Sequence, residues 1–381
     1  MLGFVRHFAP FRGRPIGVDL GATTLRLAQV DGEGADVRIV HADAIDVPAN
    51  LPAGHSQSDF VVESLRKSLR SGKFGGRQIS VALPASAVQV KHVRVGRGEA
   101  ADVNPQIIEQ AVALLGGDAA DWFIRSAIAG EVNGETPPQQ EAIAFATPRA
   151  TIEQLIEDAA SARVELAGVQ VQPRVIAAAF GEIHRRKADT EAVNLFVDFG
   201  GSGTRAMVAA PVALKFVRDV PVRVSDLHDR IARALSIDPA SAAILRRAVI
   251  ARQNGRSNEI NAPSTDGPAG DAVLLDKLSA AVEVEARRVA DELELCRRYY
   301  EATFPTQPIT KLIFTGGGAK DRMLCSAIAQ AMALPAQIGD PLVRFTRAVL
   351  PSLTCIDRRE AQPEWTVAIG LSMCAQPAGV R

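Results

Sequence analysis

One short pattern occurs twice in the chain and constrains its fold more than any other feature. It covers residues 16–26 (IGVDLGATTLR) and residues 195–205 (LFVDFGGSGTR), and the two copies align without a gap. Each copy is an apolar strand, a turn of Asp, Gly and small or hydroxyl residues, and a second strand. A single Asp-Gly hairpin would be ordinary. Two copies in register, each opening a half of similar length, predict two similar domains that face one ligand.

The turn residues suit phosphate and magnesium. Glycines let backbone N–H groups approach a ligand closely, and hydroxyl side chains add further donors. The aligned acids, Asp19 and Asp198, stand where each apolar strand stops. Mg²⁺ prefers oxygen ligands such as carboxylates and keeps several of its waters. The repeated turn therefore predicts a site for a magnesium-bound phosphate compound.

A third stretch completes the set. Residues 312–320 (LIFTGGGAK) run from an apolar strand through Gly316, Gly317 and Gly318 into a predicted helix. A glycine turn that opens a helix offers free N–H donors and the positive end of the helix dipole to an anion. The alternative interpretation is an ordinary turn between a strand and a helix, without a role in ligand binding.

Composition excludes several other classes of protein. The 381 residues are 47% hydrophobic and 23% charged, which is typical of a soluble protein with more than one core. Forty-three basic residues balance forty-three acidic ones, which argues against a nucleic-acid binder that works by broad phosphate neutralisation. We also expect no direct membrane span, because no apolar run approaches the roughly 20 residues that a spanning helix needs. These features predict a cytoplasmic protein.

The three stretches, in this order, resemble the phosphate 1, phosphate 2 and adenosine motifs of the actin-like ATPase superfamily. Within it the chain is most similar to the PilM family of type IV pilus assembly proteins. The resemblance extends from about residue 15 to about residue 375 and includes residues 81–84 (VALP) and 368–371 (AIGL). No single motif decides the family, but their order does.

The resemblance implies an α/β, actin-like (duplicated ribonuclease H-like) two-lobe fold with an inserted α+β subdomain of the FtsA/PilM type. We expect a flexible N-terminal segment before the first lobe and a mobile loop within the second. The predicted boundaries are 1–14 for the N-terminal segment; 15–78, 166–190 and 351–381 for the first lobe (1A); 79–165 for the inserted subdomain (1C); 191–225 and 301–350 for the second lobe (2A); and 226–300 for its subdomain (2B), with the loop at 252–270.

The resemblance also implies roles for the motif residues. Asp19 and Asp198 would hold Mg²⁺, mostly through waters, on the phosphates of ATP or ADP. The other contacts to the nucleotide would come from Gly21, Thr23, Thr24 and Arg26 in the first copy, from Gly200, Gly201, Ser202, Gly203 and Thr204 in the second, and from Gly316, Gly317 and Gly318 under the adenosine. Two plainer interpretations stay open: Thr204 as an ordinary strand residue, and Arg26 as a surface strand residue.

Gln172 is the candidate catalytic residue. It stands where family members carry a polar residue that orients the attacking water, and many relatives have Glu there. An amide can hydrogen-bond a water but cannot deprotonate it. Gly201 also replaces the second acid of actin's phosphate 2 motif. We therefore expect ATP hydrolysis to be slow if it occurs.

The function implied by the resemblance is that of a cytoplasmic ATP-binding scaffold of type IV pilus assembly. The N-terminal cytoplasmic tail of a PilN-like inner-membrane protein would dock between the first lobe and the inserted subdomain, and other pilus components or further copies of the chain could bind elsewhere. The alternatives are a GspL-like type II secretion component, a small-molecule kinase of the same superfamily and an FtsA-like filament former. A kinase would need an acidic or histidine base near the cleft, and GspL-like proteins continue into a transmembrane helix.

Overall fold

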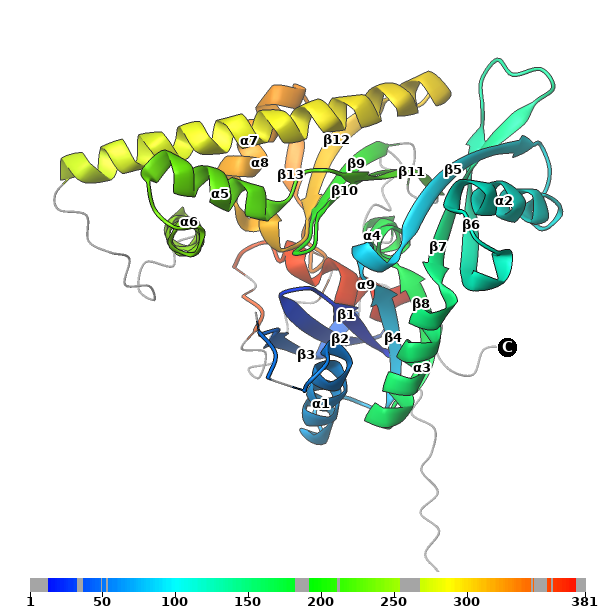
Figure 1. The fold of residues 1–381 in the computed structure, drawn as a ribbon, viewed down its shortest axis with the longest axis horizontal. Helices are drawn as coiled ribbons and strands as arrows, with labels where there is room; N and C mark the ends of the chain where they lie inside the picture. The colour runs from blue at the N-terminus through cyan, green and yellow to red at the C-terminus, as the bar shows by residue number, and fades with distance from the viewer. Residues whose placement is uncertain are drawn as a thin grey trace, which may run out of the picture.

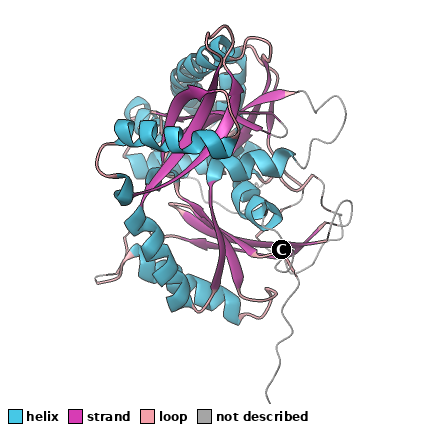
Figure 2. Ribbon diagram, turned by 90° about the vertical axis from the view of Figure 1, so that its right-hand side faces the viewer, coloured by secondary structure: helices cyan, strands magenta, loops and turns pink. Residues whose placement is uncertain are grey.

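The protein forms two lobes, each built around a five-stranded sheet (Figures 1 and 2). The computed structural model describes residues 13–32, 37–48, 50–52, 54–181, 192–210, 213–253, 268–343, 345, 355–357 and 359–374. Most of the predicted N-terminal segment 1–14 and of the predicted loop 252–270 therefore lies outside the described residues.

The first sheet has the strand order β3-β2-β1-β4-β8. Its strands are β1 (Ile16–Leu20), β2 (Thr24–Asp31), β3 (Arg38–Asp46), β4 (Gln78–Leu83) and β8 (Glu165–Val171). The β1–β2–β3 meander is antiparallel, whereas β1, β4 and β8 are parallel to one another. The apolar residues of β1 and β4 are buried, as expected for strands covered on both faces.

The second sheet repeats this plan in the order β11-β10-β9-β12-β13. Its strands are β9 (Val193–Phe199), β10 (Thr204–Ala210), β11 (Ala213–Val220), β12 (Ile309–Thr315) and β13 (Ala336–Ile338). Again the first three strands form an antiparallel meander, and β9, β12 and β13 are parallel. The same order and the same directions in both sheets bear out the duplication predicted from the repeated turn.

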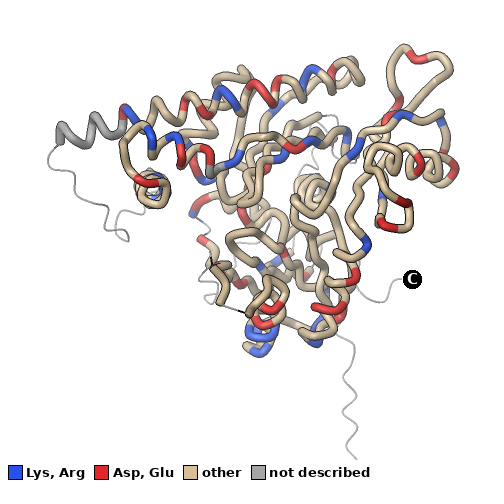
Figure 3. Tube along the Cα trace, viewed as in Figure 1, with Lys and Arg blue, Asp and Glu red and all other residues tan. Residues whose placement is uncertain are grey.

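Helices connect the strands and cover the sheets. In the first lobe these are α1 (Gln57–Arg70) and α3 (Arg149–Ala162), which pack together. In the second lobe they are α5 (Val224–Leu235), α6 (Pro239–Gln253), α8 (Arg322–Met332) and the long α7 (Pro268–Thr303), which runs along the outer edge (Figure 1). Basic and acidic residues are both spread along the described part of α7 (Figure 3), which is typical of a helix with one face in solvent.

Two helices join the lobes. α4 (Gln172–Gly181) follows β8, α9 (Thr366–Cys374) is the last described helix, and the two pack against each other. α9 crosses β1 so closely that a Cβ on Gly17 would lie 1.9 Å from the carbonyl oxygen of Ala368. A Cβ on Gly370 would likewise lie 2.8 Å from Val175 in α4. Glycine at both positions lets the backbones approach closely at the joint between the lobes.

The inserted subdomain is a three-stranded antiparallel sheet of order β5-β7-β6 with one helix on its outer face. Its elements are β5 (Gln89–Gly96), α2 (Ala100–Leu115), β6 (Trp122–Glu131) and β7 (Gln139–Pro148). It also contacts the second lobe. Tyr299 Oη donates to Glu141 Oε1 at 2.9 Å, and a ring nitrogen of His92 lies 2.9 Å from the carbonyl oxygen of Val217.

Two predicted boundaries need correction. The boundary between residues 78 and 79 placed β4 in the inserted subdomain, but β4 pairs with β1 and β8 at the centre of the first sheet, so the excursion begins after Leu83. The boundary at residue 300 gave α7 as far as Tyr300 to subdomain 2B, but α7 also packs on β10 and β11, and Leu293 and Tyr300 are fully buried in the main core. The rest of the predicted subdomain division stays a prediction.

Candidate functional site

The two repeated turns lie against each other between the lobes. β1 and β9 both end where their turn begins, and each turn leads into the next antiparallel strand. A Cβ on Gly201 would lie 3.2 Å from Thr23 Cγ2 and 3.4 Å from Ala22 Cβ, so the turns are in contact range. The duplicated turns predicted to share a ligand are therefore close together in space.

Asp19 is a buried acid with a strongly perturbed pKa. Its residue is only 7% exposed, and burial raises the pKa of its carboxyl to about 6. The positive charge of Arg26 acts in the opposite direction, the charge of Asp198 raises the pKa further, and a hydrogen bond from the Gln172 side chain lowers it. Asp19 Oδ1 is buried and has no hydrogen-bond partner. A buried carboxylate oxygen without a partner is costly and indicates that a ligand is missing from its surroundings.

Asp198 is also buried, but it is better satisfied. Thr315 Oγ1, from the end of β12, donates to Asp198 Oδ1 at 3.1 Å. Burial raises the pKa of the Asp198 carboxyl, while the hydrogen bond from Thr315 and the charge of Arg205 act against that rise. The two acids thus share a low-dielectric site in which neither ionises as readily as in water.

This donor set fits a magnesium–phosphate ligand. A divalent cation would give the unpartnered Asp19 Oδ1 a positive neighbour and relieve the repulsion between the two carboxylates. The described residues contain no group of three or more His, Cys, Asp or Glu side chains that could hold a metal alone. Two carboxylates completed by phosphate oxygens and waters are a usual environment of Mg²⁺, which rarely occupies an all-protein cage.

Each acid has an arginine directly across the hairpin. The register pairs Asp19 with Arg26 and Asp198 with Arg205. Directly opposite residues share one face of the sheet, so each guanidinium is on the same side as its carboxylate. Arg26 is partly exposed, with its guanidinium carbon 5.9 Å from the centre of the Trp365 ring. Arg205 is buried, and our sequence interpretation did not assign it to the site, although the gap-free alignment with Arg26 could have indicated it.

The predicted hydroxyl donors are not equivalent. Thr23 and Ser202 are exposed at the tips of the two turns. Thr24 Oγ1 lies 3.5 Å from Asp46 Oδ1, toward the neighbouring strand β3. Thr204 is buried opposite Phe199, so strand alternation places its side chain on the other face of the sheet from Asp198. Only the backbone of Thr204 is then near enough to serve a ligand, together with the turn glycines Gly21 and Gly203. The N–H of Gly200 is not free, because it donates to the carbonyl oxygen of Gly203 at 3.0 Å.

The glycine run lies directly behind Asp198. Gly316 has a φ of 80°, and a Cβ there would lie 2.6 Å from Asp198 Oδ1. Gly317 begins a short 3-10 helix, η4 (Gly317–Lys320), which also contains Gly318. The Gly316 N–H donates to the carbonyl oxygen of Pro363, and Lys320 forms an ion pair with Glu364. Only glycine at 316 allows the turn to approach the acid this closely.

A buried network under this turn was not predicted. Asp321 caps α8 by accepting from the Leu324 N–H, and it also pairs with Arg246 of α6 at 2.8 Å. Arg246 in turn lies 3.1 Å from a ring nitrogen of His228 on α5. The network ties the glycine turn to α5 and α6. No sequence signal joined these three residues, because they lie on three different elements.

Gln172, the candidate catalytic residue, lies beside Asp19. It is the first residue of α4, directly after the edge strand β8, and its side chain is close enough to Asp19 to lower that pKa by hydrogen bonding. An amide at this place can orient a water but cannot act as a base.

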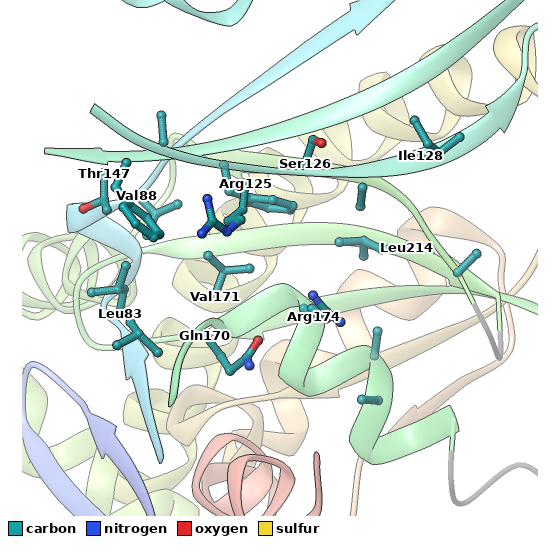
Figure 4. Close-up of a pocket in the computed structure, with 18 of the residues that line it drawn as sticks. Leu83, Val88, Arg125, Ser126, Ile128, Thr147, Gln170, Val171, Arg174 and Leu214 are labelled. Atoms are coloured by element: carbon teal, nitrogen blue, oxygen red, sulfur yellow. The ribbon is translucent and has the colours of Figure 1, made fainter. Parts of the chain in front are cut away.

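A separate pocket of about 690 Å³ lies between the first lobe and the inserted subdomain (Figure 4). β8 and α4 supply one wall, the inner face of β6 and β7 supplies another, and Leu214 of β11 contributes from the second lobe. Two arginines, Arg125 and Arg174, line it, and the lining residues include no Asp or Glu. This size and largely apolar lining are typical of a site that takes an organic ligand or a short peptide.

Comparisons with known proteins support the fold. No protein-family model and no curated protein sequence matches the chain. A solved PilM–PilN type IV pilus biogenesis complex contains a chain with a TM-score of 0.72 and 17% identity, covering 96% of this chain and 99% of that one.

Two further solved structures are more distant. EutJ, an ethanolamine utilization protein from Carboxydothermus hydrogenoformans, has a TM-score of 0.49 and 12% identity, covering 94% of this chain and 89% of its own. MreB5 of Spiroplasma citri bound to ADP has a TM-score of 0.49 and 13% identity, with 96% of both chains covered.

Proposed function

We propose that this chain, which has the actin-like two-lobe fold of the matched chain in the PilM–PilN complex, is a nucleotide-binding scaffold of type IV pilus assembly or a related machine. It would bind ATP or ADP with Mg²⁺ between the lobes and a PilN-like inner-membrane protein in the pocket beside the inserted subdomain. Such a scaffold would work at the cytoplasmic face of the membrane. No described helix is long and apolar enough to cross a bilayer, which is compatible with attachment through a partner.

The pair of buried acids carries the nucleotide half of the proposal. Asp19 and Asp198 would hold Mg²⁺, largely through waters, against the phosphates, and the N–H groups of the two glycine turns would donate to phosphate oxygens. The metal would neutralise phosphate charge. Gln172 would orient a water without taking its proton, so we expect turnover to be slow.

The pocket carries the partner half. It lies between the first lobe and the inserted subdomain, where the resemblance implies that a partner tail docks, and it is large enough for several side chains of an extended peptide. Its apolar walls would take the apolar side chains of such a tail. Because both lobes contribute to its lining, a change in lobe closure would change the pocket, and partner affinity would depend on the bound nucleotide.

Filling the pocket tests this function. Ala127 is on the face of β6 that lines the pocket, and Ala127→Trp would occupy space that the tail needs. We expect affinity for a synthetic N-terminal tail of the PilN-like protein from the same organism to fall at least about tenfold, as judged by fluorescence anisotropy. Ala327→Trp, in the groove of about 520 Å³ between α7 and α8, is the matched control and should bind normally. Failure of the folded wild type to bind the tail would contradict the partner half of the proposal.

A further inference from the structure

Arg205 is a buried cation that is only partly satisfied by the protein. The residue is 2% exposed. Its Nε donates to Asp219 Oδ1 at 2.6 Å and its Nη2 to the carbonyl oxygen of Ala85 at 3.2 Å. Its Nη1 is buried and has no hydrogen-bond partner. A guanidinium has donors on all three nitrogens, so a buried Nη1 left without an acceptor is costly, and a ligand with a free acceptor would satisfy it.

The surroundings of Arg205 indicate which ligand that is. Arg205 is directly opposite Asp198 on β9 and Asp219 on β11, so three charged residues form a row across one face of the second sheet. Its charge is near enough to Asp198 to lower the pKa of that carboxyl. A phosphate held by magnesium at Asp198 would bring anionic oxygens within the neighbourhood of Nη1. Arginine suits this role because its fork can hold two acceptors at once.

The other nitrogens of Arg205 reach the walls of the pocket. Ala85 lies in the short 3-10 helix η2 (Ala85–Ala87), between Leu83 and Val88, which both line the pocket. Asp219 lies on β11, the strand that also carries the lining residue Leu214. Arg205 is therefore in direct contact with one element of the inserted subdomain and one element of the second lobe, and both elements continue into the pocket.

We propose that Arg205 couples the phosphate site to the pocket. Nη1 binds a phosphate oxygen of the nucleotide, while Nη2 still donates to the carbonyl oxygen of Ala85 and Nε still donates to Asp219. Phosphate binding thereby fixes the guanidinium and, through it, the segment from Leu83 to Val88 and strand β11. This inference rests on the proposed nucleotide site and adds the residue that links it to the partner.

The coupling can be measured without the partner. Hydrogen–deuterium exchange is followed by mass spectrometry in the full chain, with and without Mg-ATP at saturating concentration. In the wild type, nucleotide should slow exchange both at the turns around Asp19 and Asp198 and in the segment from Leu83 to Val88. In Arg205→Gln, nucleotide should no longer slow exchange in that segment but should still slow it at the two turns. The affinity for Mg-ATP should fall about tenfold to a hundredfold, which corresponds to the loss of a hydrogen bond to a charged group.

Two further variants make the result decisive. Arg205→Lys keeps the charge but lacks the fork, so it should bind Mg-ATP more tightly than Arg205→Gln and still lose the slowing between Leu83 and Val88. Arg218→Gln is the matched control and should behave as the wild type. Arg218 is next to Asp219 on β11, and its partners are Glu292 and Cys296 of α7. The coupling would be overturned if nucleotide still slowed exchange between Leu83 and Val88 in both Arg205 variants. It would also be overturned if exchange there were not slowed in a nucleotide-bound wild type. A folded wild type without any Mg-ATP binding would instead overturn the proposed nucleotide site.

Discussion

The two halves of the molecule share one backbone plan and differ in how they treat the acid at its centre. In the second half, Asp198 accepts a hydrogen bond from Thr315, its register partner on the parallel strand β12. In the first half, the register partner of Asp19 on β4 is Ala82, which has no hydroxyl. One oxygen of Asp19 has no partner, and burial raises the pKa of its carboxyl to about 6.

The arginines differ in the same sense. Arg205 is buried and bonded to the second lobe and the inserted subdomain, whereas Arg26 is partly exposed and lies beside the ring of Trp365. In the second hairpin the acid is satisfied, and the buried polar atoms without a partner are Nη1 of Arg205 and Oγ1 of Thr204. In the first hairpin it is the acid itself that has an unpartnered oxygen, Asp19 Oδ1. A duplicated backbone does not require duplicated electrostatics. We therefore expect the first acid to gain more than the second from binding a cation.

The largest effect on stability should come from removing the charge of Asp19. Its pKa is about 6 in the folded protein and 3.8 in its ordinary state, so the folded chain holds a proton that the unfolded chain releases between these pH values. The free energy of unfolding therefore contains a term that is fully favourable below about pH 4 and is lost as the pH rises through about 6. The difference between these two pKa values corresponds to about 3 kcal/mol of free energy of unfolding. Asp19→Asn should thus be more stable than the wild type at pH 8, by up to about 3 kcal/mol, and show little gain at pH 4.

Chemical denaturation at both pH values measures this difference. Asp198→Asn is the matched comparison, and its gain at pH 8 should be smaller, because Asp198 Oδ1 already accepts a hydrogen bond from Thr315, whereas Asp19 Oδ1 has no partner. Equal gains in the free energy of unfolding for the two variants would contradict the asymmetry between the halves. A gain in Asp19→Asn that does not change with pH would also contradict it.

A smaller difference is expected between the glycines that follow the two acids. A Cβ on Gly21 would lie 2.4 Å from the carbonyl oxygen of Thr24, whereas a Cβ on Gly200 would lie 3.2 Å from that of Gly203. The first contact requires the backbone to move, and the second requires only a small adjustment. Gly21→Ala should therefore lower the free energy of unfolding by about 2 kcal/mol and Gly200→Ala by less than about 1 kcal/mol. Thermal unfolding of the two variants measures which of them is destabilised more. A larger destabilisation by Gly200→Ala than by Gly21→Ala would contradict the tighter packing of the first turn.

The sequence predicted the parts of the fold that repeat. The gap-free alignment of the two turns gave the duplication, and the structure confirms two sheets with the same strand order. The glycine run was correctly placed between a buried strand and a helix, because Gly316, with its positive φ, interrupts the apolar pattern of β12. The close approach of the two turns also followed from their symmetry. The roles assigned to the individual site residues remain predictions.

Other features depend on contacts that no local pattern encodes. The position of β4 in the first sheet was missed because Pro84 resembles a turn within one small unit, and only the pairing with β1 reveals that it ends a central strand. The pair of Arg246 with Asp321 joins residues 75 positions apart. Arg205 was visible in the alignment, but its burial and its bond to Ala85 follow from the packing of one lobe on the other.

The most direct test of the account is magnesium-dependent nucleotide binding by the two carboxylate variants. A fluorescent ATP analogue is titrated, with and without Mg²⁺, against the wild type, Asp19→Asn and Asp198→Asn, each first shown to be folded. The account predicts tight binding by the wild type only with Mg²⁺, and a loss of about a hundredfold or more in both variants, even though Asp19→Asn has the more stable fold. Binding that does not depend on Mg²⁺, or that survives in both variants, would contradict the claim that the two buried acids form the phosphate site.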